Sequence, residues 1–312
     1  MSATSVLVLG GSGMLGSMLA DALSRDAGLE VSATVRDPGL LARGRSLLPD
    51  VRWAVLDAAD PDFPGLPSLF DGQAWVVNAV GVIKPLIRED DPADVERAIR
   101  VNSLWPHELA RIAGCSGARI IQIATDCVYS GRKGRYTEND VHDPTDVYGK
   151  TKSLGEVRDP GVLHLRCSIV GPEPRSHRSL LGWFLGQKPG STVPGYVNHR
   201  WNGLTTLHFA GLCRGIIREN LSLDGVRHVV PADDVTKREL LELFRAHFRR
   251  PDIKVDPREA AVVIDRTLAT EDVETNAALW RAAGYPSPPT VAAMVEELAA
   301  YDYRLGDLAA PA

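Results

Sequence analysis

The sequence predicts an α/β fold in which a doubly wound parallel sheet carries helices on both faces and a smaller C-terminal α/β lobe binds substrate. Two observations indicate it. Short apolar runs alternate with helical patterns through the first half of the 312-residue chain. These runs lack polar alternation, as is typical of parallel strands buried on both faces. The β-α-β order then requires crossover connections, so the strands should run parallel.

Six strands are expected in the N-terminal part, and each is bounded by turn-forming or helical sequence. They cover residues 5–10, 30–35, 51–56, 74–80, 119–124 and 162–167, with helices near 14–26, 38–48, 92–114 and 146–157. After residue 168 Pro and Gly become frequent, and helical patterns follow near 177–187, 207–219, 236–248, 271–283 and 290–301. We therefore expect one domain at 1–170, with 205–230 packing back onto it, and a substrate-binding lobe at 171–312.

Composition excludes several classes of protein. A net charge of −5 argues against a nucleic-acid partner, which usually meets a basic face. No apolar run approaches the roughly 20 residues that span a bilayer, and the N-terminus lacks the features of a signal peptide. Four scattered cysteines without a C-x-x-C pair indicate a reducing compartment, with neither structural disulfides nor a metal site. We therefore expect a cytoplasmic protein that contacts no membrane.

The segment "LVLGGSGMLG" joins the first strand to the first helix and predicts a dinucleotide site. Gly10, Gly13 and Gly16 allow a tight turn and a close approach of backbone to a pyrophosphate. Ser12, Met14 and Leu15 complete the turn, so that phosphates meet the free N–H groups of a helix N-terminus. Residues 1–170 are thus expected to form a Rossmann domain.

Arg36 ends the second strand, where an arginine suits the 2′-phosphate of NADP and an acid suits the ribose of NAD. We therefore expect NADP(H), with NAD less favoured. The alternative is an ordinary surface pair of Arg36 with the adjacent Asp37. Asp57 follows the third strand and could meet the adenine amine, although an Asp that opens a loop also caps helices routinely.

Tyr148 and Lys152 lie four residues apart, on the same face of an expected helix. A tyrosine has an ordinary pKa near ~10, which a nearby ammonium and an oxidised nicotinamide would lower. Thr125 ends the fifth strand and can donate to the carbonyl oxygen that Tyr148 protonates. A hydride from the cofactor and a proton from the tyrosine together reduce a carbonyl group.

These features resemble the extended short-chain dehydrogenases/reductases, and within them the dTDP-4-dehydrorhamnose reductase family of nucleotide-sugar reductases. The matching segments run from residue 5 to about 210; they are "GGSGMLG", "NAVGVIK", "VNSLWP", "ATDCVYSGRKGRYTENDVHDPTDVYGKTKSLGE", "LRCSIVGPE" and "WNGLTTLHFA". The resemblance implies NADPH-dependent reduction of the C4 keto group of a 6-deoxy nucleotide sugar. It also implies a monomer or a homodimer.

The resemblance assigns roles to individual residues. It makes Thr125, Tyr148 and Lys152 catalytic. The dinucleotide would be held by the glycine turn, Arg36, Asp57, Asn78, Ala79, Val80, Gly81 and Asn102, besides Tyr148 and Lys152. The substrate site would include Lys84, Asp126, Cys127, Arg200 and Trp201, with Arg266 as a second phosphate contact. For Trp201 the alternative is packing in the core.

Two other functions stay open. Cys127 stands where epimerase-reductases of the GDP-fucose synthase type carry an acid/base cysteine, and His177 would be its partner; alternatively, Cys127 packs as a small apolar residue. A 4,6-dehydratase would need a Glu after Asp126, and this chain has none there. The other function is a non-catalytic, NADP-binding regulatory subunit, although such a subunit does not need the complete Thr-Tyr-Lys set.

Overall fold

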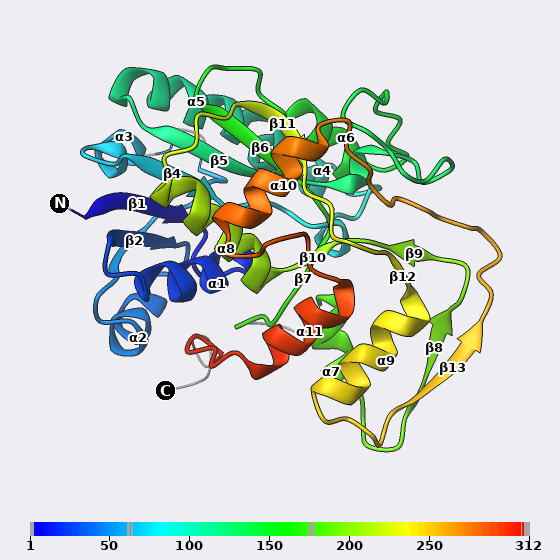
Figure 1. The fold of residues 1–312 in the computed structure, drawn as a ribbon. Helices are drawn as coiled ribbons and strands as arrows, with labels where there is room; N and C mark the ends of the chain where they lie inside the picture. Colours follow the sequence, from blue (N-terminus) through cyan, green and yellow to red (C-terminus); the bar gives the residue numbers. More distant parts are fainter. Residues whose placement is uncertain (1–2, 61–62, 64, 175–177, 307, 309–312) are drawn as a thin grey trace.

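The computed structural model describes residues 3–60, 63, 65–174, 178–306 and 308 (Figure 1). Its centre is a seven-stranded parallel sheet in the order β11-β6-β5-β4-β1-β2-β3. The strands are β1 (Thr4–Leu9), β2 (Leu29–Val35), β3 (Arg52–Val55), β4 (Trp75–Asn78), β5 (Arg119–Ala124), β6 (Val162–Arg166) and β11 (Gly225–His228). The predicted doubly wound α/β fold is confirmed.

Alternate side chains of the strands enter two cores, one on each face of the sheet. Val6 and Val8 join the first core, with apolar residues of α1 (Met14–Ser24), α2 (Leu40–Leu47) and α8 (Thr206–Arg218). Leu7 and Leu9 join the second, with residues of α3 (Leu66–Phe70) and α5 (Trp105–Ser116). Figure 1 shows the two groups of helices on opposite sides of the strands. The apolar runs lack polar alternation because both faces are buried.

The predicted helix at 92–114 is wrong as a single α-helix. It consists of α4 (Pro92–Ile99), a wide π-helical turn η2 (Arg100–Leu104) and α5. Pro106 lacks an N–H group and cannot complete the regular helical hydrogen bonds at this point. Such single wide turns occur often at functional sites, and this one carries Asn102.

The chain after residue 168 builds three two-stranded sheets and four more helices in the described residues. β7 (Ile169–Val170) pairs with β10 (Leu204–Thr205), β9 (Arg200–Trp201) with β12 (Val235–Thr236), and β8 (Thr192–Tyr196) with β13 (Lys254–Arg258). The helices are α7 (Leu180–Leu185), α9 (Lys237–His247), α10 (Val273–Ala282) and α11 (Val291–Ala300). In Figure 1 α7, α9, β8 and β13 gather away from the large sheet.

Part of this C-terminal chain returns to the large sheet. α8 packs on α1, and β11 adds a strand beside β6, which the sequence did not predict. α10 packs in turn on α8. The division of the chain at residue 170 stays a prediction. None of the helices in the described ranges is long and apolar enough to cross a membrane.

Candidate active site

A cavity of about 720 Å³ runs from the glycine turn to α6 (Val147–Leu154). Fifteen of the residues that the sequence singled out line it; they are Gly10, Ser12, Gly13, Met14, Leu15, Arg36, Asp57, Ala79, Val80, Gly81, Thr125, Asp126, Cys127, Tyr148 and Lys152. Residues expected to bind cofactor and residues expected to carry chemistry therefore share one space. Among the described residues, no group of three or more His, Cys, Asp or Glu side chains is placed to hold a metal ion.

The glycine turn has the geometry that a pyrophosphate site needs. Gly10 has φ +87°, a left-handed conformation that glycine adopts without strain. A Cβ on Gly16 would lie 2.0 Å from the Gly10 carbonyl oxygen, so only glycine lets α1 approach the turn this closely. Gly13 caps α1 without a side-chain hydrogen bond, which leaves the first N–H groups of α1 to an anion.

Arg36 lies exposed at the end of β2 and lines the cavity. The neighbouring Asp37 carboxylate accepts the N–H of Gly39 at 2.9 Å. Asp57 lines the cavity as well, and its carboxylate accepts the N–H of Ala59 at 2.9 Å. Asp57 thus stabilises its own loop while it borders the cavity.

Asn78 and Asn102 lie beneath the cavity and do not line it. Asn78 is fully buried, and its side-chain oxygen accepts the N–H of Val80 at 3.1 Å. Asn102 exchanges two hydrogen bonds with the backbone of Val82, at 2.8 and 2.9 Å. Both amides therefore fix the 79–82 loop, whose own residues face the cavity.

Thr125 ends β5 and caps the short helix η3 (Asp126–Val128): its hydroxyl accepts the N–H of Cys127 at 3.2 Å. Tyr148 and Lys152 project from α6, which Asp146 caps by accepting the N–H of Gly149 at 2.8 Å. A Cβ on Gly149 would lie 2.2 Å from the Cys127 carbonyl oxygen. This glycine therefore lets the start of α6 approach η3, which brings Tyr148 to Thr125.

The charges around Tyr148 differ from the sequence-based expectation. Burial raises the pKa of Tyr148, and a hydrogen bond with Thr125 partly opposes this rise. The Lys152 ammonium donates to the Ile123 carbonyl oxygen at 3.0 Å, and burial lowers the pKa of Lys152 to about 8. The protein's own groups thus raise the pKa of the phenol; the positive charge of an oxidised nicotinamide arrives only with the cofactor.

Cys127 lines the cavity beside Asp126. Burial, and secondly the charge of Asp126, raise the pKa of Cys127 to about 12, so the thiol stays protonated at neutral pH. It is therefore suited to donate a proton rather than to accept one. His177, its expected partner, lies outside the described residues.

The remaining residues expected at the substrate site do not line this cavity. Lys84 pairs with Asp146 at 2.8 Å, and Arg200 forms an ion pair with Asp234. Arg266 donates from Nε to the Tyr129 carbonyl oxygen at 2.8 Å. Trp201 is only 4% exposed and donates from its indole nitrogen to the Ser168 hydroxyl at 2.9 Å, a placement that fits the alternative of core packing.

Several lining residues escaped the sequence analysis. Cys167, Ser168 and Ile169 follow β6 and border the cavity, as does Arg97 of α4. The first three could have been found from their position, because ligands of such sheets bind at the carboxyl ends of strands. For Arg97 the sequence shows only a charged helix face.

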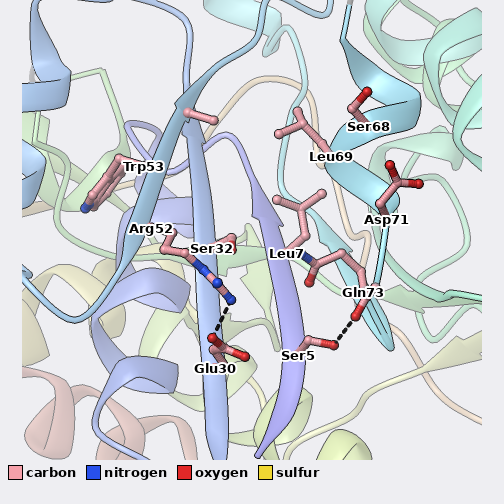
Figure 2. A pocket seen from close by; sticks show the side chains of 12 residues that line it. Ser5, Leu7, Glu30, Ser32, Arg52, Trp53, Ser68, Leu69, Asp71 and Gln73 are labelled. Carbon is pink, nitrogen blue, oxygen red and sulfur yellow. Dashed lines mark hydrogen bonds and ion pairs between the residues drawn. The ribbon is translucent and has the colours of Figure 1, made fainter.

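A second, smaller crevice of about 360 Å³ lies toward the amino ends of β1 and β2 (Figure 2). Figure 2 shows Arg52 paired with Glu30, at 2.5 Å. Ser5 donates to the Gly72 carbonyl oxygen at 2.6 Å. The described residues that line this crevice include none that the sequence singled out, and it lies at the opposite end of β1 from the glycine turn.

Comparison with known proteins identifies a family and several relatives to which the chain is similar. A family model described as the RmlD substrate binding domain matches residues 4–169, more than half of the chain. The β subunit of methionine adenosyltransferase 2 from Rattus norvegicus is 26% identical over 200 residues, 61% of this chain and 59% of that protein. A dTDP-4-dehydrorhamnose reductase from Streptomyces griseus is 35% identical over 151 residues, 48% of this chain and 43% of that protein. The matches thus span about half the length of these relatives.

Solved structures share the fold. A dTDP-4-dehydrorhamnose reductase from Bacillus anthracis, in complex with NADP, superposes with a TM-score of 0.70 at 15% identity, covering 95% of this chain and 98% of that one. A mutant UDP-glucuronic acid 4-epimerase from Bacillus cereus, in complex with a fluorinated UDP-glucuronic acid and NAD, superposes with a TM-score of 0.71 at 17% identity, covering 96% of this chain and 99% of that one. At these identities the likeness extends to the fold alone.

Proposed function

Because this chain belongs to the RmlD substrate-binding domain family, we propose that it is an NADPH-dependent reductase of a 4-keto-6-deoxy nucleotide sugar. The observation that carries the proposal is the shared cavity, in which the glycine turn, Thr125, Tyr148 and Lys152 meet. A sheet, a phosphate cradle and a proton donor beside a hydroxyl together suit carbonyl reduction.

The residues of the turn fit a dinucleotide. The uncapped N-terminus of α1 and the close approach at Gly10 and Gly16 suit its phosphates, and Arg36 suits a 2′-phosphate. NADPH, when bound, supplies the hydride. Lys152 would orient the nicotinamide ribose through its ammonium.

The chain's own groups supply the proton. Tyr148 donates its phenolic proton to the carbonyl oxygen of the substrate, and Thr125 donates a hydrogen bond to the same oxygen. A high pKa suits this task, because the tyrosine must hold its proton until negative charge develops on the substrate oxygen. Tyr148 is half-buried, and the resulting rise in the pKa of its phenol supports such a role.

The test is NADPH oxidation with dTDP-4-dehydrorhamnose. Tyr148→Phe should lower turnover by ~10²–10⁴-fold, the usual effect of losing one general acid, and leave NADPH affinity nearly intact. Tyr196→Phe in β8, outside the cavity lining, is the matched control and should keep wild-type turnover. Near-normal turnover by the Tyr148→Phe variant would contradict the proposed mechanism.

A second candidate is a non-catalytic, NADP-binding regulatory subunit. The similarity to a protein named as the β subunit of methionine adenosyltransferase 2 favours it. The two candidates differ in one measurement. If the wild-type protein binds NADPH but consumes none with any 4-keto nucleotide sugar, the binding subunit replaces the reductase.

A further inference from the structure

Arg97 is a cation of the cavity lining that the proposed mechanism does not use. It lies in the last turn of α4 and borders the same cavity as the glycine turn. Among the described residues, three arginines line this cavity: Arg36, Arg97 and Arg178. The side chains of Arg36 and Arg178 are exposed, whereas Arg97 is half-buried and makes contacts that fix its guanidinium.

Two oxygen atoms hold the Arg97 guanidinium. Its Nη2 donates to the Leu86 carbonyl oxygen at 2.7 Å and lies 2.8 Å from a carboxylate oxygen of Asp94, three residues earlier in α4. The Asp94 side chain is buried, so the ion pair is anchored in the protein. Its negative charge compensates part of the charge of Arg97 and repels a phosphate brought to the same place. Arg97 therefore suits an uncharged part of a ligand.

The hydrogen bond to Leu86 places Arg97 at an apolar wall of the cavity. Members of this wall belong to, or pack against, one hydrophobic cluster, and all of them line the cavity; they are Leu56, Ala58, Ala59, Val80, Val82, Leu86 and Val101. Three of them follow β3 beside Asp57, the residue that the sequence places near an adenine amine. A planar cation fixed at the edge of an apolar wall suits a flat aromatic ring.

We propose that Arg97 is a cofactor-binding residue, whose guanidinium stacks on the adenine ring of the dinucleotide beside the apolar wall. The face of an aromatic ring attracts a guanidinium, most strongly where water is excluded. NADPH and NADH both carry this ring, so Arg97 serves the affinity for either dinucleotide, whereas Arg36 serves the choice between them. The inference rests on the proposed function in one respect, because it needs a dinucleotide in the cavity.

The experiment compares Arg97→Leu, Arg97→Lys and the control Arg111→Leu with the wild type. Arg111 is a matched control, because it pairs with an acid three residues earlier in its helix, as Arg97 does, but lies outside the cavity lining. Fluorescence titration measures the affinities for NADPH, NADH and reduced nicotinamide mononucleotide, which lacks the adenosine. Arg97→Leu should weaken NADPH and NADH alike by roughly 3-fold to 30-fold and leave the mononucleotide unchanged. Arg111→Leu should change none of the three affinities.

Arg97→Lys separates stacking from a structural role. Lysine keeps the charge and can donate to the Leu86 carbonyl oxygen, but it lacks the planar group. This variant should melt at the temperature of the wild type and still bind both dinucleotides at least about threefold more weakly. Wild-type affinity in either Arg97 variant, a loss confined to NADPH, or an equal loss for the mononucleotide overturns the inference and leaves the reductase proposal standing. A wild type that binds neither dinucleotide overturns both.

Discussion

Replacing Arg36 by Ala tests the predicted preference for NADP. Arg36 lines the cavity at the end of β2, and a hydrogen bond from the Gly10 N–H to the Thr34 hydroxyl, at 3.1 Å, ties this strand end to the glycine turn. Asp37 is not among the lining residues, and its carboxylate accepts the Gly39 N–H. The cavity therefore meets the cation rather than the carboxylate, which is the arrangement that suits a 2′-phosphate.

The size of the effect follows from the contact that is lost. A hydrogen bond between a charged pair contributes about 1.5–3 kcal/mol, and each 1.4 kcal/mol corresponds to about tenfold in affinity. Arg36→Ala should thus weaken NADPH by roughly 10-fold to 100-fold and change NADH by less than about threefold. Fluorescence titration measures both. Arg45→Ala, in the last turn of α2 and outside the cavity lining, is the control. Equal weakening of NADPH and NADH, or a wild type that prefers NADH, would refute the reasoning.

Three further predictions concern the turn, the thiol and the amine. Gly16→Ala should abolish NADPH binding and lower the free energy of unfolding by about 1–3 kcal/mol, as denaturant titration measures. Gly114→Ala is the control: its Cβ would meet nothing within 4 Å, so the free energy of unfolding should rise by about 0.5–1 kcal/mol. Cys127, whose pKa burial raises to about 12, should resist iodoacetamide at about pH 8 while the exposed Cys115 reacts, and mass spectrometry can measure both. If the product takes up carbon-bound deuterium from D₂O and Cys127→Ser abolishes this uptake, the protein is an epimerase as well. Because burial lowers the pKa of Lys152 to about 8, the unfolded chain binds more protons at this residue than the folded protein does above about pH 8. The free energy of unfolding of the wild type should therefore rise by about 2 kcal/mol relative to Lys152→Met between about pH 7 and about pH 9.5. No change in that difference with pH would contradict a buried, charged Lys152.

Strands of the large sheet could be predicted because burial on both faces leaves an uninterrupted apolar run. β11 escaped prediction for the opposite reason. It begins at Gly225, with φ +67°, and ends in Arg227 and His228, so its sequence lacks the usual strand signal. Only pairing with β6, far away in the sequence, makes it a strand. The break at η2 was missed because the apolar pattern continues across it, although Pro106 marks it in the sequence.

The residues of the candidate site also fall into two groups, those that a local sequence pattern predicts and those that it does not. The glycine turn and the Tyr-Lys pair lie within single local elements, so their spacing in the sequence already predicts their geometry. Arg97 lines the same cavity but belongs to α4, where the sequence shows only a charged helix face. Arg97 joins the site through the packing of α4 against α6, two helices that are far apart in the sequence. No local pattern could indicate it.

The long segment between Thr125 and Tyr148 contains little regular structure, and such segments are usually mobile. In this protein the buried guanidinium of Arg166 holds the segment in place. Arg166, 1% exposed at the end of β6, pairs with Glu156 just beyond α6 and donates to the Tyr129 hydroxyl at 2.7 Å. Tyr129 stacks on Tyr136 with ring centroids 4.3 Å apart, and the Tyr136 backbone bridges to Leu268 of the C-terminal part. A buried ion pair is costly unless fully hydrogen-bonded, so its value lies in specifying one arrangement. The pair thereby holds the segment between Thr125 and Tyr148, the two side chains to which the proposed mechanism assigns one carbonyl oxygen.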